Sequence, residues 1–281
     1  MKYTAIGAFP PIFGERRVKE EARARVVCVA GSRVTAEWVA RRLRAIGYEV
    51  DDLVEVEPSE SSISLLLKDL IDKYDVVVVT GGVEPGSAPT FTAAAEALGR
   101  SLVVDEEALR LVEEHYYTLY REEGGKGAFR LPEEAEPLFK LPEGSIVIPN
   151  PRGPSPGVIL EEDGKYLVCL PSSPLEACEM FEDEVDQYVR SLLGVNLSAT
   201  VHVMTRVWDA GLLARVVEEL ASKEPWIFAQ VKLNVYSEEG RGVTVTVFAK
   251  EAEELSEKLE TAVKLVEEEL ERMGINYIKR A

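Results

Sequence analysis

The chain has 281 residues, with 50 Asp and Glu residues against 32 Lys and Arg residues, which gives a net charge of −18. So acidic a composition argues against a nucleic-acid partner, because nucleic-acid binding needs a basic face that neutralises phosphates. The sequence contains no long uncharged apolar run and no signal-peptide pattern within its first 17 residues. We therefore expect no membrane span and a cytoplasmic protein.

Two further features of the composition are informative, namely the few cysteines and the excess of charged over other polar residues. Three scattered cysteines, Cys28, Cys169 and Cys178, build neither a disulfide framework nor a zinc motif, and the first and second of them lie in apolar runs that predict core positions. Asn, Gln, Cys and His are scarce while Glu, Arg and Lys are plentiful, which is typical of a thermophilic source with surface ion-pair networks.

In the first two thirds of the chain, hydrophobic spacing predicts strands that alternate with helices. Strands are expected at Arg25–Val29, Glu49–Val56 and Val76–Thr80, and helices at Ala36–Ile46, Pro58–Ile71, Thr92–Leu98, Asp105–Arg121 and Pro174–Leu193, with short strands between residues 141 and 172. Alternation of this kind indicates βαβ units and a mostly parallel sheet, which is an α/β fold.

The pattern changes around Gly194-Val195-Asn196. The segments Thr200–Val207, Asp209–Ser222, Ile227–Tyr236, Val243–Ala249 and Ala252–Met273 predict the order β-α-β-β-α. This is a small α+β module with its helices on one face of a mostly antiparallel sheet. We expect a domain boundary near residue 195, with domains at 25–195 and 196–281 after an N-terminal extension of residues 1–24.

The most informative local feature is an apolar run that ends in two glycines. Val76–Val79 is followed by Thr80-Gly81-Gly82, which predicts a buried parallel strand and a glycine turn at its carboxyl end. Ligands of parallel α/β sheets lie at that edge, and glycines let backbone N–H groups approach them closely. The alternative is that the glycines serve turn geometry alone.

Two downstream loops have the character of binding surfaces. The loop from Asn150 to Gly157 contains three prolines, which fix φ and lower the entropic cost of a preformed surface. The segment from Leu170 to Glu176 joins a strand to a helix start, and its hydroxyl and free N–H groups suit an anion. A rigid connector and a capped helix are the structural alternatives for these loops.

Taken in order, the three loops resemble the molybdopterin-binding fold shared by the MoaB/Mog proteins and the N-terminal domain of the competence/damage-inducible protein CinA. The resemblance covers roughly residues 25 to 190 and is also carried by the helix Trp38–Leu43 running into Gly47. The C-terminal module resembles the KH-like second domain of CinA, with Trp208–Leu213 at the start of its first helix. The chain is similar to the short archaeal-type form, which lacks the CinA deamidase domain.

The resemblance implies a MoaB/Mog-like three-layer sandwich followed by a KH-like or ferredoxin-like α+β domain. It also implies a homodimer and a small-molecule ligand, either a pterin or a nucleotide. The implied ligand-binding residues are Thr80, Gly81, Gly82, Glu84, Gly86, Ser87, Thr90, Asn150, Pro151, Gly153, Ser155, Pro156, Gly157, Ser172, Ser173 and Glu176.

The chain departs from the family where the family carries acids. The family's Gly-Asp-Glu-Leu turn after the first strand is replaced by Gly31-Ser32-Arg33-Val34, and the Asp-Asp pair after Gly-Gly is missing between Val83 and Thr90. The family's Lys-Gln-Ala is replaced by Pro137-Leu138-Phe139. Mg²⁺ prefers carboxylate and phosphate oxygens, so Glu84 is the one candidate catalytic or ligating carboxylate in its loop, and no complete metal site is predicted.

Three hypotheses follow for function. The first is a molybdopterin- or nucleotide-binding protein with weakened or lost catalysis. The second is an enzyme that acts with Mg²⁺ on a nucleotide pyrophosphate, either by ADP-ribose hydrolysis or by adenylyl transfer to molybdopterin, with Glu84 as ligand or base. The third is a non-catalytic oligomeric scaffold. His115 and His202 show no catalytic or metal spacing, and we interpret both as structural residues.

Overall fold

The computed structural model describes residues 18–29, 31–232 and 234–278, so most of the N-terminal extension predicted at residues 1–24 lies outside the described residues. The chain divides into two compact units. The first comprises Ala22–Ala40 and Glu49–Val189, and the second is built on Arg190–Ala281 together with Arg41–Tyr48. The domain limits given above stay a prediction.

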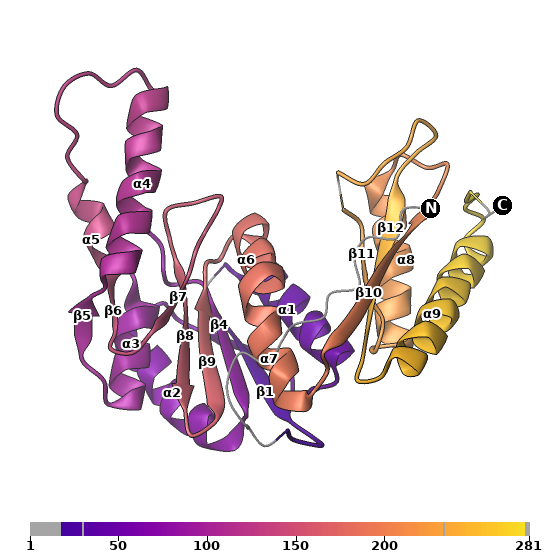
Figure 1. The fold of residues 1–281 in the computed structure, drawn as a ribbon, viewed down its shortest axis with the longest axis horizontal. Helices are drawn as coiled ribbons and strands as arrows, with labels where there is room; N and C mark the ends of the chain where they lie inside the picture. The colour runs from indigo at the N-terminus through magenta and orange to yellow at the C-terminus, as the bar shows by residue number, and fades with distance from the viewer. Residues whose placement is uncertain (1–17, 30, 233, 279–281) are drawn as a thin grey trace. The chain divides into compact units, whose positions relative to one another are not determined.

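The first unit is organised around a mixed sheet with the strand order β2-β1-β4-β9-β8-β7, to which β3 is added by pairing with β1 (Figure 1). Parallel pairing joins β1 to β2, β3 and β4, and β4 to β9, while β8 and β7 are antiparallel. The strands are β1 (Arg23–Val29), β2 (Glu49–Val50), β3 (Val54–Val56), β4 (Val76–Thr80), β7 (Ile146–Ile148), β8 (Gly157–Glu162) and β9 (Lys165–Leu170). The predicted α/β fold with a mostly parallel sheet is confirmed.

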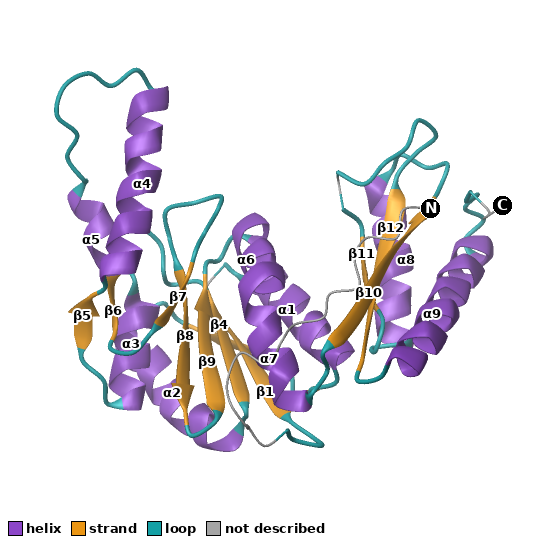
Figure 2. Cartoon of the chain, viewed as in Figure 1, coloured by secondary structure: helices purple, strands orange, loops and turns teal. Residues whose placement is uncertain are grey.

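Helices connect these strands, as the βαβ pattern predicts (Figure 2). They are α1 (Arg33–Ile46), α2 (Glu60–Lys73), α3 (Pro89–Leu98), α4 (Glu106–Glu122), α5 (Glu136–Phe139), α6 (Pro174–Met180) and α7 (Asp186–Leu193). Local signals set several starts: Ser59 accepts a hydrogen bond from Ser62 N at 3.2 Å, and Asp105 accepts one from Ala108 N at 2.9 Å. Each capped start satisfies an otherwise unpaired N–H group.

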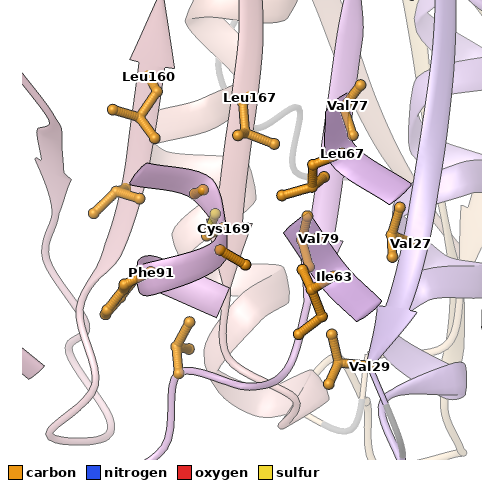
Figure 3. Close-up of a cluster of buried hydrophobic side chains, with 14 of the residues drawn as sticks. Val27, Val29, Ile63, Leu67, Val77, Val79, Phe91, Leu160, Leu167 and Cys169 are labelled. Atoms are coloured by element: carbon orange, nitrogen blue, oxygen red, sulfur yellow. The ribbon is translucent and has the colours of Figure 1, made fainter. Parts of the chain in front are cut away.

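The core of this unit lies between the sheet and the helices α2 and α3. Ile63 and Leu67 from α2 and Phe91 from α3 pack on valines of β1 and β4 and on Leu160, Leu167 and Cys169 of β8 and β9 (Figure 3). Each such side chain contributes about 1.5–3 kcal/mol by leaving water. Cys28 and Cys169 are both buried, as predicted, and burial raises the pKa of the Cys169 thiol to about 12.

On the opposite side of the sheet, α1 contacts the segment that follows α6. Trp38 meets Phe181 edge to face, with ring centroids 5.8 Å apart. Phe181 begins a π-helical turn, Phe181–Val185, which interrupts the single helix predicted over Pro174–Leu193. The predicted strand Glu49–Val56 is likewise split into β2 and β3, because Asp51–Leu53 does not pair with β1.

A small two-stranded sheet in the same unit was not expected from the sequence. It consists of β5 (Leu102–Val104) and β6 (Lys140–Pro142), which pair antiparallel. The short 3₁₀ helix Glu133–Ala135 leads into α5. Strands of three residues carry little periodicity, so their pairing comes from tertiary context rather than from local pattern.

The second unit has the predicted β-α-β-β-α order. Its elements are β10 (Leu197–Met204), α8 (Ala210–Lys223), β11 (Phe228–Gln230), β12 (Gly242–Ala249) and α9 (Ala252–Arg272), and its antiparallel sheet has the order β10-β12-β11. The strand predicted over Ile227–Tyr236 is limited to β11. Asp209 caps α8 by accepting hydrogen bonds from Gly211 N and Leu212 N. None of the helices in the described ranges is long and apolar enough to cross a membrane.

Candidate functional site

The candidate site lies at the edge of the sheet where β1, β4 and β9 end. Because these strands are parallel, the loops that follow them meet at one edge. Gly81 N donates to Leu170 O at 2.8 Å, and Thr35 Oγ1 of α1 donates to Ser172 O at 2.5 Å. The loops after β4 and β9 are therefore tied to each other and to the first turn of α1.

The glycine turn after β4 is packed closely against the chain's own atoms. Gly81 and Gly82 have φ angles of +84° and +72°, and a Cβ atom on Gly82 would lie within 3.0 Å of Thr90 Oγ1. Thr90 in turn donates from Oγ1 to Gly81 O at 2.8 Å and from N to Gly82 O at 3.0 Å. The turn-geometry interpretation of this glycine pair is thus sufficient to explain both residues.

Two of the predicted ligand residues lie beneath this turn. Thr80 and Thr90 have 0% exposed area, and Thr80 Oγ1 lies 2.8 Å from the hydroxyl of Ser32, which is itself buried. Ser32 also donates to Thr80 O at 2.7 Å. These hydroxyls hydrogen-bond the loops after β1 and β4 to each other and to the first turn of α3. Thr80 and Thr90 therefore contribute to the site by supporting its loops from beneath.

Glu84 turns its half-buried carboxylate toward the backbone of both loops. Its Oε1 accepts a hydrogen bond from Ser172 N at 3.2 Å, and its Oε2 accepts one from Val83 N at 2.8 Å. The carboxylate of Glu84 therefore links the loop after β4 to the loop after β9. Backbone N–H groups that converge in this way form an anion-binding position.

Asn150 organises the proline-rich loop between β7 and β8. Its Oδ1 accepts from Arg152 N and Gly153 N, each at 3.0 Å, and its Nδ2 donates to Ser155 O at 2.8 Å. The same amide donates to Glu176 Oε2 of α6 at 2.6 Å. Asn150 thus joins the proline-rich loop to the segment after β9.

The start of α6 brings hydroxyl groups to the same edge. Ser173 is the N-cap residue of α6, and within the described chain its side chain makes no capping hydrogen bond. Ser172 and Ser173 are half-buried. Glu176 packs against Gly153 so closely that a Cβ on this glycine would lie within 3.0 Å of the carboxylate. Gly153 is needed for this approach.

The remaining predicted residues fall into two groups. Ser155, Pro156 and Gly157 are buried and form the base of the proline-rich loop, while Pro151 is exposed. Gly86 and Ser87 are exposed and line a separate hollow of about 300 Å³ together with Glu60 and Lys140. The predicted residues thus differ in environment: some are buried at the base of the proline-rich loop, and Gly86 and Ser87 line this separate hollow.

One side chain near the site was not predicted to belong there. His115 of α4 is half-buried; burial lowers its pKa, and the charge of Glu176 acts on it in the opposite direction. Figure 2 shows α4 and α6 rising at the end of the sheet to which β9 points. The sequence holds no signal for this approach, because α4 and Glu176 belong to separate elements and only the fold brings them close.

The described residues do not fit a magnesium site. No group of three or more His, Cys, Asp or Glu side chains in the described chain is arranged to hold a metal ion. Both oxygens of Glu84 already accept backbone hydrogen bonds, and Glu176 accepts one from Asn150. Mg²⁺ requires nearly octahedral oxygen coordination, for which these two carboxylates offer little.

Comparison with known proteins agrees with this fold. Residues 29–191 match the family model described as a probable molybdopterin binding domain. A protein of Pyrobaculum arsenaticum is 32% identical over 197 residues, which are 69% of this chain and 71% of the relative. A putative competence-damage inducible protein of Alkaliphilus oremlandii is 28% identical over 249 residues, 86% of this chain but only 55% of that longer protein.

The solved structures give the same answer for the fold. A crystal structure of the protein CinA of unknown function from Thermoplasma acidophilum superposes with a TM-score of 0.53 and 24% identity. It covers 60% of this chain and 99% of that one. The family match spans more than half of the chain, and the predicted resemblance is confirmed. The chain belongs to the family of probable molybdopterin-binding domains, as a CinA-like protein with a MoaB/Mog-type domain.

Proposed function

We propose that the chain binds a pterin or a nucleotide at the carboxyl edge of β1, β4 and β9, and that its catalysis is weakened or lost. The observation that carries the proposal is the convergence of Val83 N–H and Ser172 N–H on one carboxylate. These two amides come from separate loops and lie 2.8 and 3.2 Å from the two oxygens of the Glu84 carboxylate. Such a donor pair suits a phosphate or another acidic group of a ligand.

The walls of the site are preformed, which supports binding. Asn150 fixes the proline-rich loop through its hydrogen bonds to Arg152, Gly153 and Ser155. Thr35 fixes the loop after β9 through Ser172 O. A surface ordered before the ligand arrives loses less conformational entropy on binding.

The proposal of weakened catalysis rests on the charged residues. The aspartates expected from the family after the first strand and after Gly-Gly are replaced by residues such as Ser32 and Arg33, and Glu84 is committed to two backbone N–H groups. A metal-assisted reaction at a pyrophosphate would need Glu84 to exchange these contacts for a metal ion. Such an enzyme is the second candidate, and a homodimeric scaffold without ligand is the third.

A thermal-shift screen of the whole chain tests the proposal. The probes are a pterin, AMP, ADP-ribose and ATP, each with and without Mg²⁺. A ligand at a hundred times its Kd stabilises the folded state by about 2.7 kcal/mol, a visible shift of the melting temperature. Stabilisation without metal is the expected result. A shift that requires Mg²⁺ supports the enzyme hypothesis. If none of the probes shifts the melting temperature, the proposal is contradicted and the scaffold remains as the hypothesis.

A further inference from the structure

Glu84 is placed where the anionic group of a ligand would be. Its two carboxylate oxygens accept hydrogen bonds from Ser172 N at 3.2 Å and Val83 N at 2.8 Å. These are the two amides to which we assign the ligand's acidic group. A tethered carboxylate and a free anion cannot both occupy the same pair of donors.

We propose that Glu84 is an internal competitor that sets the charge selectivity of the site at this edge of the sheet: an anionic ligand binds only by displacing it from the Val83 and Ser172 amides. This inference rests on the proposed function, and it names what governs access to the same site. The apparent Kd for an anion then equals the intrinsic Kd divided by the fraction of molecules in which Glu84 is displaced.

The loop that carries Glu84 allows this exchange without unfolding. Its backbone is held by Gly86 N, which donates to Glu134 O at 2.7 Å, and by Ser87 N, which donates to Glu84 O at 3.2 Å. Glu84 itself is half-buried, and the next three residues, Pro85, Gly86 and Ser87, are exposed. In the proposed exchange, rotation of the Glu84 side chain frees the amide pair while these two backbone hydrogen bonds stay in place.

The charge of Glu84 has a second consequence. When an anion enters and Glu84 stays close, the two like charges repel each other, and this repulsion adds to the cost of binding the anion. A ligand whose contact group is neutral meets less opposition. Glu84 thus makes the site selective against free phosphate and pyrophosphate, in spite of its two suitable amide donors.

The test is an NMR titration of the full chain with inorganic pyrophosphate, comparing the wild type with Glu84→Ala and Glu84→Gln. We expect Glu84→Ala to bind pyrophosphate roughly tenfold to a hundredfold more tightly, with the Ser172 amide among the most shifted signals. Glu84→Gln keeps the shape without the charge and should gain affinity by a smaller factor. Glu133→Ala, which removes an exposed carboxylate from the nearby 3₁₀ helix, is the control and should leave the affinity unchanged.

Equal or weaker binding by Glu84→Ala and Glu84→Gln would overturn the inference, and weaker binding would make Glu84 a supporting group of the ligand site. The two proposals fail separately. If a pterin or nucleotide stabilises the wild type but pyrophosphate binds to no variant, only the competitor role is refuted. If no probe binds to any variant, both proposals are refuted. Circular dichroism melts verify that each variant is folded, and Glu84→Gln serves if Glu84→Ala is not.

Discussion

Substitution of Gly82 by alanine separates the two explanations of the glycine pair. The new Cβ would lie within 3.0 Å of Thr90 Oγ1 and 3.3 Å from Val29 Cγ1, at a φ of +72°. Left-handed backbone costs an L-residue about 1–2 kcal/mol, and overpacking a buried position costs about 1–3 kcal/mol more. We therefore expect Gly82→Ala to lower the free energy of unfolding by about 2–5 kcal/mol.

Gly86→Ala is the matched control. Gly86 has a φ of +83°, but a Cβ there would meet no atom within 4 Å in the described structure. This variant should lose only the backbone contribution of about 1–2 kcal/mol. In Gly82→Ala/Thr90→Ala the clashing hydroxyl is gone, so the double variant should be less destabilised than the sum of the single variants.

The assay is urea unfolding, followed through the amide signals of β4 and β9, so that the unfolding of the first unit is measured by itself. Because the chain holds two units, one two-state fit to a global signal would not be valid. Equal destabilisation by Gly82→Ala and Gly86→Ala would refute the packing argument. So would a Gly82→Ala variant that keeps its stability and loses only ligand binding, because the glycine would then serve the approach of a ligand.

Three further predictions concern other parts of the chain. Ser59→Ala should lower the free energy of unfolding by about 1 kcal/mol because the α2 cap is lost. Ser173→Ala should lower it by less than about 0.5 kcal/mol and weaken ligand binding instead, and equal losses in denaturant melts would contradict this. Asn150→Ala should cost about 1–2 kcal/mol, because the Gly153 N–H of a buried residue loses its acceptor while the exposed Arg152 N–H bonds to water instead. It should also speed hydrogen exchange in its loop, and unchanged exchange would refute the bracing role. Burial lowers the pKa values of His115 and His202, so folding favours the neutral forms of both side chains. Their contribution to the free energy of unfolding is therefore present above pH 6.5 and is lost as the pH falls below that value. NMR titration midpoints above 6.5 would contradict this prediction.

The architecture of the sheet was largely predictable because its most distinctive strand is defined by a local sequence pattern. Four consecutive valines followed by Thr80-Gly81-Gly82 define β4, and all five residues of that strand are buried. The strand β5 was missed, since three residues give no usable periodicity, and β6 lies at the start of the range of short strands expected from residue 141, although Pro142 itself argues against a strand. Their pairing depends on the chain between them folding back.

The candidate site was less predictable than the fold. Resemblance to a family placed the three loops together, but it could not show that Glu84 reaches the Ser172 amide, 88 residues further along the chain. Nor could it show that Thr80 and Thr90 lie fully buried beneath the loops. Such facts depend on side-chain directions at the ends of separate strands, and these directions are fixed only when the sheet and helices are assembled.

The most direct test of the central claim is amide chemical-shift mapping of the full chain during titration with a pterin and with ADP-ribose, without Mg²⁺. We expect the shifted signals to gather at the carboxyl edge of the sheet, at Gly81, Gly82, Gly153, Ser172 and Ser173. Shifts confined to β10, β11 and β12, or no shift with either compound, would contradict the proposal that this edge is a ligand-binding site.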